Sequence, residues 1–314
     1  MSRTASVLLA VFIALAGCEQ STPNPDGPAP LRDSVSPNAS SATPAPEQSP
    51  PTAETTMSTQ ELISLIRAGY DDRAITMASA SGPGVFDSVQ PLLGDSSPQV
   101  RAISLRVLDA ADAQRAQPLA VQSLSDPSDD VKTFAVAILR PNPPAGIMAH
   151  LLSAYATARE PALRGQIALL AGRVTPTEAI DAWRMHWASE TDPYTKEDIA
   201  KALARMGDEP ARKDFVATMN AAQGRKAFDT IRGTVYFEDN WIIPHLIPLL
   251  SRRDVALHLA ADFPDTHPFR VCDVALEAIL ALTGEQVKFQ TPRPTQYSDS
   301  EIAAVAAIAR KHSP

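Results

Sequence analysis

The side chains best suited to chemistry lie in one short segment near the carboxyl end of the chain. His258 and Asp262 are four residues apart, so they would share one face if this segment were helical. Together with His267, they offer the nitrogen and oxygen donors that zinc prefers. The alternative is a polar loop that joins two helices, with Asp265 as a helix cap, and we favour this loop. The sequence therefore predicts no metal site and no cofactor. If a metal were bound in this segment, its candidate ligands would be His258, Asp262 and His267.

The motifs of the common enzyme classes are absent from the sequence. It contains no His-Glu-x-x-His, no paired Cys-x-x-Cys, no glycine-rich phosphate loop and no Gly-x-Ser-x-Gly elbow. Cys272 is one of only two cysteines, and we interpret its lone thiol as structural rather than catalytic. We therefore expect no catalytic residue and predict that the chain is not an enzyme.

The other cysteine, Cys18, follows an apolar run from Val7 to Leu15. That run is far shorter than the about 20 residues needed to span a bilayer, and it has the length of a signal-peptide core. The sequence Leu15-Ala-Gly-Cys18 resembles the bacterial lipobox. This resemblance implies that residues 1–17 are removed by cleavage between Gly17 and Cys18, and that Cys18 is acylated and anchors the chain to a lipid bilayer. The alternative is an ordinary signal peptide that contains a cysteine.

The residues that follow Cys18 predict a location and a tether. Glu19 at the next position resembles the sorting signal of Gram-negative lipoproteins for the outer membrane, facing the periplasm or the cell exterior. Residues 18–56 are mostly Pro, Ser, Thr, Ala, Asn and acids, and Leu31 and Val35 are their only large apolar side chains. Such a segment cannot bury enough surface to offset its ordering entropy, so we expect a disordered linker.

Residues 57–284 contain a repeating pattern of charged and apolar residues. Asp95, Val100 and Arg101 are matched 31 residues later by Asp126, Val131 and Lys132. After each valine, apolar residues recur at helical spacing, as Ile103, Val107 and Leu108 in the first copy and Phe134, Ile138 and Leu139 in the second. Looser copies follow Glu160-Pro161, with Arg164 as the basic residue, then Asp192-Pro193 and Pro268, where Cys272 takes the basic position. An apolar segment precedes each of these helices, which predicts helix-turn-helix units.

These units resemble HEAT repeats, including the HEAT-like repeats of phycobilin lyases. The resemblance rests on the Asp-x-x-x-x-Val-Arg/Lys signatures and on residues 241–250 and 270–284. It implies an all-α fold, an α-solenoid of about six to seven HEAT-like repeats over residues 57–284. Residues 208–240 lack the signature, and residues 285–314 are expected to be an extended segment and a C-terminal capping helix that starts with the capping box Ser298-Asp-Ser-Glu301.

Two groups of residues within the repeats are interpreted as architecture. The signature acids and bases, including Asp95, Arg101, Asp126, Lys132 and Arg164, are expected to cap helix starts and to pair along the array. The aromatic residues Tyr155, Trp183 and Trp187 are expected to fill core space, with an aromatic binding stripe as the alternative. Cys272 occupies a basic position of the repeat, so we expect it to be less buried than a core thiol.

The expected function is binding of another protein rather than chemistry. A formal net charge of −8 argues against nucleic acid as a partner and favours a basic or neutral one. We expect a protein-protein interaction scaffold or adaptor in the bacterial envelope, with a protein or peptide along the concave face of the solenoid. Two alternatives remain open. One is a lyase- or transferase-like enzyme related to bilin lyases, and the other is a metal- or small-ligand-binding sensor that uses the segment from His258 to His267.

Overall fold

The computed structural model describes residues 58–313 except for 175–178, 259–266 and 293–295. Gly17, Cys18, Glu19 and the tether of residues 18–56 therefore lie outside the described residues, as do Asp262 and Asp265. None of the helices in the described ranges combines the length and the hydropathy that a membrane crossing requires. The account of the fold below concerns the part of the chain after residue 57.

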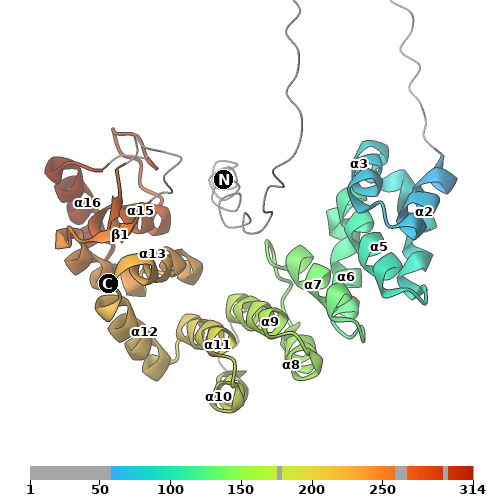
Figure 1. Ribbon diagram of the computed structural model, residues 1–314, viewed down its shortest axis with the longest axis horizontal. Helices are drawn as coiled ribbons and strands as arrows, with labels where there is room; N and C mark the ends of the chain where they lie inside the picture. Colours follow the sequence, from blue (N-terminus) through green and yellow to red (C-terminus); the bar gives the residue numbers. More distant parts are fainter. Residues whose placement is uncertain (1–57, 175–178, 259–266, 293–295, 314) are drawn as a thin grey trace, which may run out of the picture. The chain divides into compact units, whose positions relative to one another are not determined.

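The described residues form an all-α solenoid, in which helices follow one another as seven antiparallel pairs (Figure 1). The first helices of the pairs are α2 (Thr59–Ala68), α4 (Phe86–Val89), α6 (Ala113–Ser123), α8 (Met148–Thr157), α10 (Ile180–Ser189), α12 (Glu209–Ala221) and α14 (Ile243–Leu246). Their partners are α3 (Asp71–Ser81), α5 (Pro98–Ala111), α7 (Asp129–Leu139), α9 (Pro161–Val174), α11 (Pro193–Met206), α13 (Gly224–Gly233) and α15 (Val271–Thr283). The fold class predicted from the repeats is confirmed.

Two of the first helices are broken into short turns by proline. The segment around α4 consists of the 3₁₀ turns η1 (Gly82–Val85) and η2 (Gln90–Gly94) on either side of the helix. The segment around α14 has the same plan, with η5 (Asn240–Ile242) and η6 (Ile247–Ser251). Prolines stand at the first positions of η1, η2, α14 and η6, where their missing N–H costs no intrahelical hydrogen bond.

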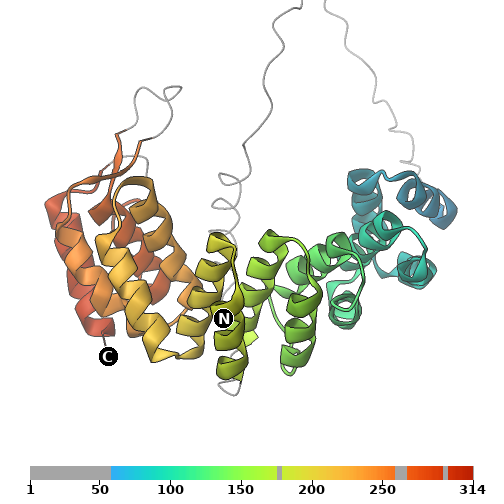
Figure 2. The same ribbon diagram turned by 60° about the horizontal axis from the view of Figure 1, so that its bottom comes forward.

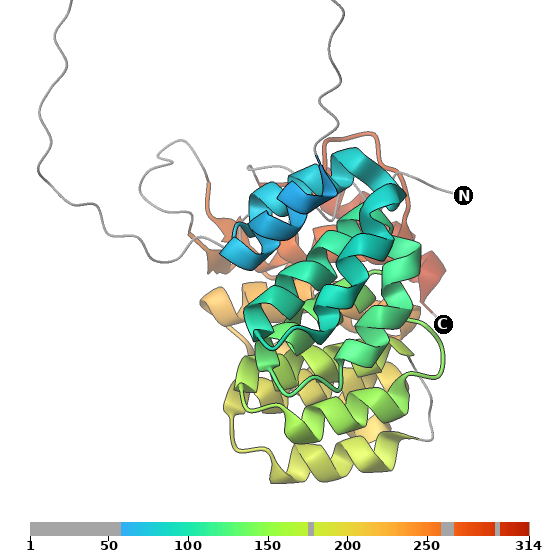
Figure 3. The same cartoon turned by 90° about the vertical axis from the view of Figure 1, so that its right-hand side faces the viewer.

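The second helices pack against one another along the array. Helices α3, α5, α7, α9 and α11 are in contact in this order, and we call the surface that they share the second-helix face. Figure 2 shows these neighbouring helices side by side, and Figure 3 looks onto the first pairs of the array, with α2 and α3 in blue. After α11 the pattern changes, because α11 packs on α12 and α13 packs on α15. The 3₁₀ turn η4 (Thr234–Phe237) follows α13, so residues 208–240 form a helix pair without the signature.

The apolar core of the described residues is a series of three clusters that share helices. Helix α5 contributes Leu108 to the first cluster and Leu105 to the second. Helix α11 contributes Leu203 to the second cluster and Ala204 to the third. Each repeat therefore buries its apolar side chains against its neighbours, which is the nearest-neighbour stabilisation of a solenoid.

The last helix, α16 (Asp299–His312), packs on α15, α14 and η6. Its predicted capping box is present, because the Glu301 N–H donates to the Ser298 hydroxyl at 3.3 Å and the Ser298 N–H donates to the Glu301 carboxylate at 2.7 Å. Ile302, Val305 and Ala309 are its buried residues. The helix covers the apolar side of α15, as a capping helix should.

One element of the last repeat was not predicted. Strand β1 (Val255–Leu257) pairs in antiparallel fashion with strand β2 (Phe269–Arg270), on either side of the segment where a polar loop was expected. The strands hold only three and two residues, which is too few for side-chain alternation to be recognised in the sequence.

Candidate functional site

The repeat signature joins neighbouring repeats. The Arg101 guanidinium donates from Nε and Nη2 to the two carboxylate oxygens of Asp126, both at 2.8 Å, and from Nη1 to the main-chain oxygen of Asp95 at 2.9 Å. Burial alone would raise the pKa of Asp126, but the hydrogen bonds from Arg101 and from the Ser128 N–H together lower it. The expected pairing along the array is therefore present, and it links the base of one repeat to the acid of the next. Val100 and Val131 beside this pair are buried core residues.

Lys132 departs from the expected pairing. Its side chain is buried, and its Nζ donates to Asp129 at 3.2 Å rather than to the signature residue Asp126. The other Asp129 oxygen accepts from the main-chain N–H groups of Arg159 and Glu160, at 2.7 and 2.9 Å. The junction between α7 and α9 is thus held through the carboxylate of Asp129, the first residue of α7, because a lysine has no planar fork to span two repeats.

A dense polar network is centred on Glu190. Its carboxylate accepts from Arg164 Nε and Nη2 at 2.8 and 3.0 Å, and from the Tyr155 hydroxyl at 2.7 Å. The main-chain N–H groups of Thr191 and Asp192 also donate to it, both at 3.0 Å. The hydrogen bonds from Arg164 outweigh burial, which would raise the pKa of Glu190, and together with the other donors they lower that pKa to about 2.

Glu190 is a residue that the motif search missed. The acid expected for Arg164 in the next repeat was Asp192, but Asp192 caps α11 by accepting from the Thr195 N–H, and Arg164 pairs with Glu190 instead. The sequence separation between base and acid could have identified Glu190. Arg101 and Asp126 are 25 residues apart, and Arg164 and Glu190 are 26 apart. A carboxylate whose oxygens all accept from the protein's own groups positions helices and is poorly placed to move a proton.

The aromatic residues of α8 and α10 divide between core and surface. Tyr155 and Trp183 are buried and pack edge to face, with ring centroids 5.2 Å apart. The Trp183 indole N–H points to the sulfur of Met148 at 3.4 Å. Trp187 is exposed, and the Lys196 ammonium lies 5.2 Å from its ring. Core filling therefore holds for the first two residues and fails for Trp187.

The candidate metal ligands do not form a site in the described part of the chain. His258 follows strand β1 and His267 precedes strand β2, and both side chains are exposed. His258 is not part of a helix, and Asp262 lies outside the described residues. Among the described residues, no group of three or more His, Cys, Asp and Glu side chains could hold a metal ion.

Cys272 is fully buried, which corrects the expectation that it would be less buried than a core thiol. Strand β1 and the chain around Tyr297 cover the start of α15, and no sequence pattern marks either of them as a covering element. The Cys272 N–H bonds to the Arg252 oxygen at 3.0 Å, and burial raises the pKa of the thiol. Such a thiol has little thiolate at neutral pH and is a poor nucleophile.

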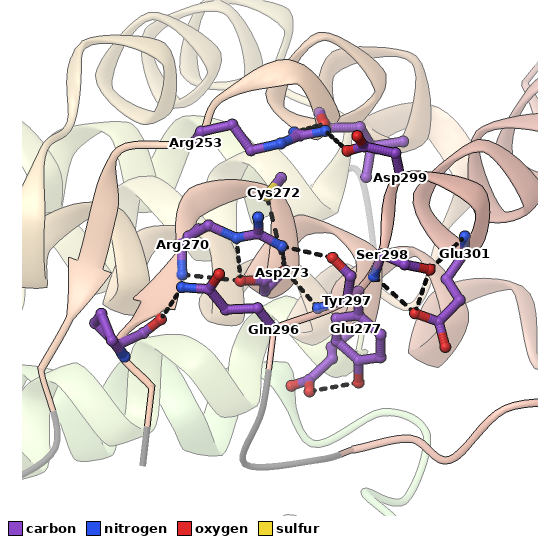
Figure 4. A network of polar contacts seen from close by, with 12 residues as sticks. Arg253, Arg270, Cys272, Asp273, Glu277, Gln296, Tyr297, Ser298, Asp299 and Glu301 are labelled. Atoms are coloured by element: carbon purple, nitrogen blue, oxygen red, sulfur yellow. Dashed lines mark hydrogen bonds and ion pairs between the residues drawn. The ribbon is translucent and has the colours of Figure 1, made fainter. Parts of the chain in front are cut away.

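The next residue, Asp273, is the centre of the network in Figure 4. It accepts from Arg270 Nε and Nη2 at 2.9 and 2.8 Å and from the Tyr297 N–H at 3.2 Å. Arg270 also donates to the Tyr297 oxygen at 2.6 Å, and the Tyr297 hydroxyl donates to Glu277 at 2.9 Å. These bonds fix the chain before α16 onto α15, so the network attaches the capping helix.

A hollow of about 270 Å³ opens on the second-helix face. It lies between α3, α5 and α7, and its walls are Ile75, Arg106, Asp109, Ala110, Phe134, Ala137 and Ile138. Arg106 forms an ion pair with Asp71, and its guanidinium lies 4.9 Å from the centre of the Phe134 ring. Within the described residues Asp109 has no hydrogen bond or ion pair, and burial raises its pKa. The hollow therefore combines mainly apolar walls with an arginine that is already paired with Asp71 and an acid that has no partner of its own among the described residues.

Comparisons of the sequence and the structure with protein-family models, curated proteins and solved structures find no match.

Proposed function

We propose that this protein is a lipid-anchored scaffold that binds a protein or peptide partner on its second-helix face. The observation that carries the proposal is the hollow between α3, α5 and α7, where the half-buried Asp109 has no hydrogen bond or ion pair among the described residues, while Arg106 in the same wall is already paired with Asp71. A lysine side chain fits this combination, because its aliphatic stem would contact Phe134 and Ile138 while its ammonium met the carboxylate. The net charge of −8 favours the same basic class of partner.

The anchor in this proposal rests on residues outside the described part of the chain. Leu15-Ala-Gly-Cys18 supports acylation of Cys18, and Glu19 supports transport to the outer membrane. The Pro- and Ser-rich residues 19–56 would span about 35 Å as a flexible coil. Such a tether would let the solenoid reach a partner at a distance from the bilayer, in the periplasm or at the cell surface.

The proposal is tested by recovering partners from detergent-solubilised membranes with the full-length chain as bait. We expect Asp109→Lys to reduce the recovered partner at least tenfold, because it sets a like charge against the incoming ammonium. We expect Cys18→Ser to move the bait from the membrane to the soluble fraction. Asp214→Lys is the matched control, because Asp214 is exposed on α12, away from the second-helix face. A partner that Asp109→Lys and Asp214→Lys retain equally would contradict the proposed site.

A further inference from the structure

Two arginines occupy equivalent positions on neighbouring second helices. Arg173 is the thirteenth residue of α9, which starts at Pro161, and Arg205 is the thirteenth of α11, which starts at Pro193. Both hold the carboxylate of Glu238. Arg173 Nη2 lies 2.9 Å from Oε1, and Arg205 Nη2 lies 2.8 Å from Oε2. One carboxylate thus bridges two repeats at the second-helix face.

The bridging carboxylate comes from a distant segment. The Tyr236 side chain of the turn η4 reaches α9, where its hydroxyl donates to the Leu169 oxygen at 2.7 Å. The Arg205 guanidinium lies 5.0 Å from the centre of the Tyr236 ring. Glu238 at the end of this turn has φ 49°, and it is the one non-glycine residue of the described ranges with a positive φ. A glutamate in this left-handed conformation is held there at a conformational cost.

The two guanidinium groups use few of their donors. Arg173 Nε, Arg205 Nε and Arg205 Nη1 are buried and have no hydrogen-bond partner among the described residues. The Arg205 side chain is only 10% exposed, so water has little access to these donors. A buried N–H group without an acceptor is costly, and more so on a charged group.

Other arginines of the same chain are fully engaged. Arg101, Arg164 and Arg270 each direct Nε and Nη2 to the two oxygens of a single carboxylate. This side-on geometry is the strongest arrangement of an arginine and a carboxylate. Arg173 and Arg205 each give Glu238 only one nitrogen, so the buried Nε donors of both groups would gain an acceptor only from a carboxylate that replaced Glu238 between them.

We propose that Arg173 and Arg205 form a carboxylate-binding site for an acidic side chain of the partner, and that Glu238 occupies this site until the partner displaces it. The partner then carries a basic group for the hollow beside Asp109 and an acidic group for the Arg173–Arg205 pair. The identity of the ligand as a partner segment rests on the proposed function. The preference of the pair for a carboxylate does not, so the two parts are tested separately.

The carboxylate preference is tested with acetate and the variant Glu238→Gly, since glycine adopts φ 49° without strain. In the full-length protein, exchanging chloride for acetate at constant ionic strength should raise the melting temperature of this variant by about 3 °C. The wild type and the triple variant Glu238→Gly/Arg173→Gln/Arg205→Gln should show only the smaller, equal shift that acetate gives through its exclusion from the protein surface. An equal response of all three proteins would overturn the site.

The acidic partner is tested with fluorescein-labelled hexaglutamate, followed by fluorescence anisotropy. Glu238→Gly should bind this peptide at least tenfold more tightly than the wild type, and adding Arg205→Gln should abolish the gain. Arg225→Gln is the matched control, because Arg225 is exposed and, among the described residues, its ion pair is with Asp229 in its own helix. If acetate stabilised Glu238→Gly but the variant bound the peptide no more tightly than the wild type, the proposal of an acidic partner would be refuted. The proposal of a carboxylate-binding site would stand. Neither result bears on the Asp109→Lys experiment, which tests the proposed function.

Discussion

Replacing Glu190 with glutamine is expected to lower the free energy of unfolding by about 3 kcal/mol at pH 7. The carboxylate joins α8, α9 and α11 through Tyr155, Arg164 and the main chain before α11. Its pKa falls from an ordinary 4.5 to about 2, and each pKa unit corresponds to about 1.4 kcal/mol. Glutamine would place an N–H₂ group among donors and leave Arg164 without its anion. Urea unfolding followed by circular dichroism measures the loss.

Glu190 also affects how the free energy of unfolding depends on pH. A carboxyl group whose pKa is lower in the folded state stabilises the fold above the pKa of the unfolded chain, and the effect is lost as pH falls to the folded value. The contribution of Glu190 should therefore be complete above pH 4.5 and disappear as the pH approaches about 2. Glu190→Gln should reduce the difference between the unfolding midpoints at pH 7 and pH 3.

Glu197→Gln provides the matched control for the glutamate. Glu197 lies on α11 and pairs with Lys201 one helical turn away, at 3.2 Å. Its side chain is 44% exposed, so the pair should contribute about 0.5 kcal/mol or less. If the two glutamine variants lost equal stability, or if Glu190→Gln kept the acid sensitivity of the wild type, the central role of Glu190 would be refuted.

Gly172→Ala is expected to cost about 3 kcal/mol, because no side chain fits between α9 and α11 at this point. A Cβ atom at position 172 would lie 2.9 Å from the Cα atom of Ala202 and would overlap the Tyr236 hydroxyl. The backbone of α11 cannot move aside without disturbing the buried residues Ile199 and Leu203. Calorimetric melting of the purified protein measures the effect.

Two further variants separate crowding from a general intolerance of helical alanine. Tyr236→Phe removes the hydroxyl that the new methyl group meets, so in the Gly172→Ala background it should recover about 1 kcal/mol. Gly233→Ala on α13 places a methyl group where nothing lies within 4 Å, and it should be neutral or stabilising. Strict additivity of the two changes at positions 172 and 236 would contradict the proposed overlap.

The repeats were predictable because their signals are local. Helical spacing after Val100 and Val131, and the capping box of Ser298 and Glu301, lie within a few residues of the elements that they specify. The ion pair between Arg101 and Asp126 was predictable as a pairing along the array, because the signature residues recur at a constant separation in neighbouring repeats. Helix pairs that bury apolar faces against their neighbours therefore appear in the sequence as a periodic pattern.

The features that escaped prediction depend on contacts between distant segments. Tyr236 reaches a main-chain oxygen 67 residues earlier, and Arg205 meets Glu238 across 33 residues. Both contacts lie where α11 packs on α12 and the signature is lost, so no periodicity marks them. Cys272 is buried by strand β1 and by the chain around Tyr297, which the repeat pattern does not include.

Site-specific photo-crosslinking in intact cells tests the central claim most directly, that the second-helix face binds the partner. Benzoylphenylalanine in place of Ala137 would project from the hollow on α7, whereas in place of Ala149 it would project from the first helix α8. Both residues are exposed, so neither replacement disturbs the core. The account predicts a crosslinked partner at position 137 that is at least tenfold more abundant than at position 149. Equal crosslinking at both positions, or crosslinking at position 149 alone, would contradict it.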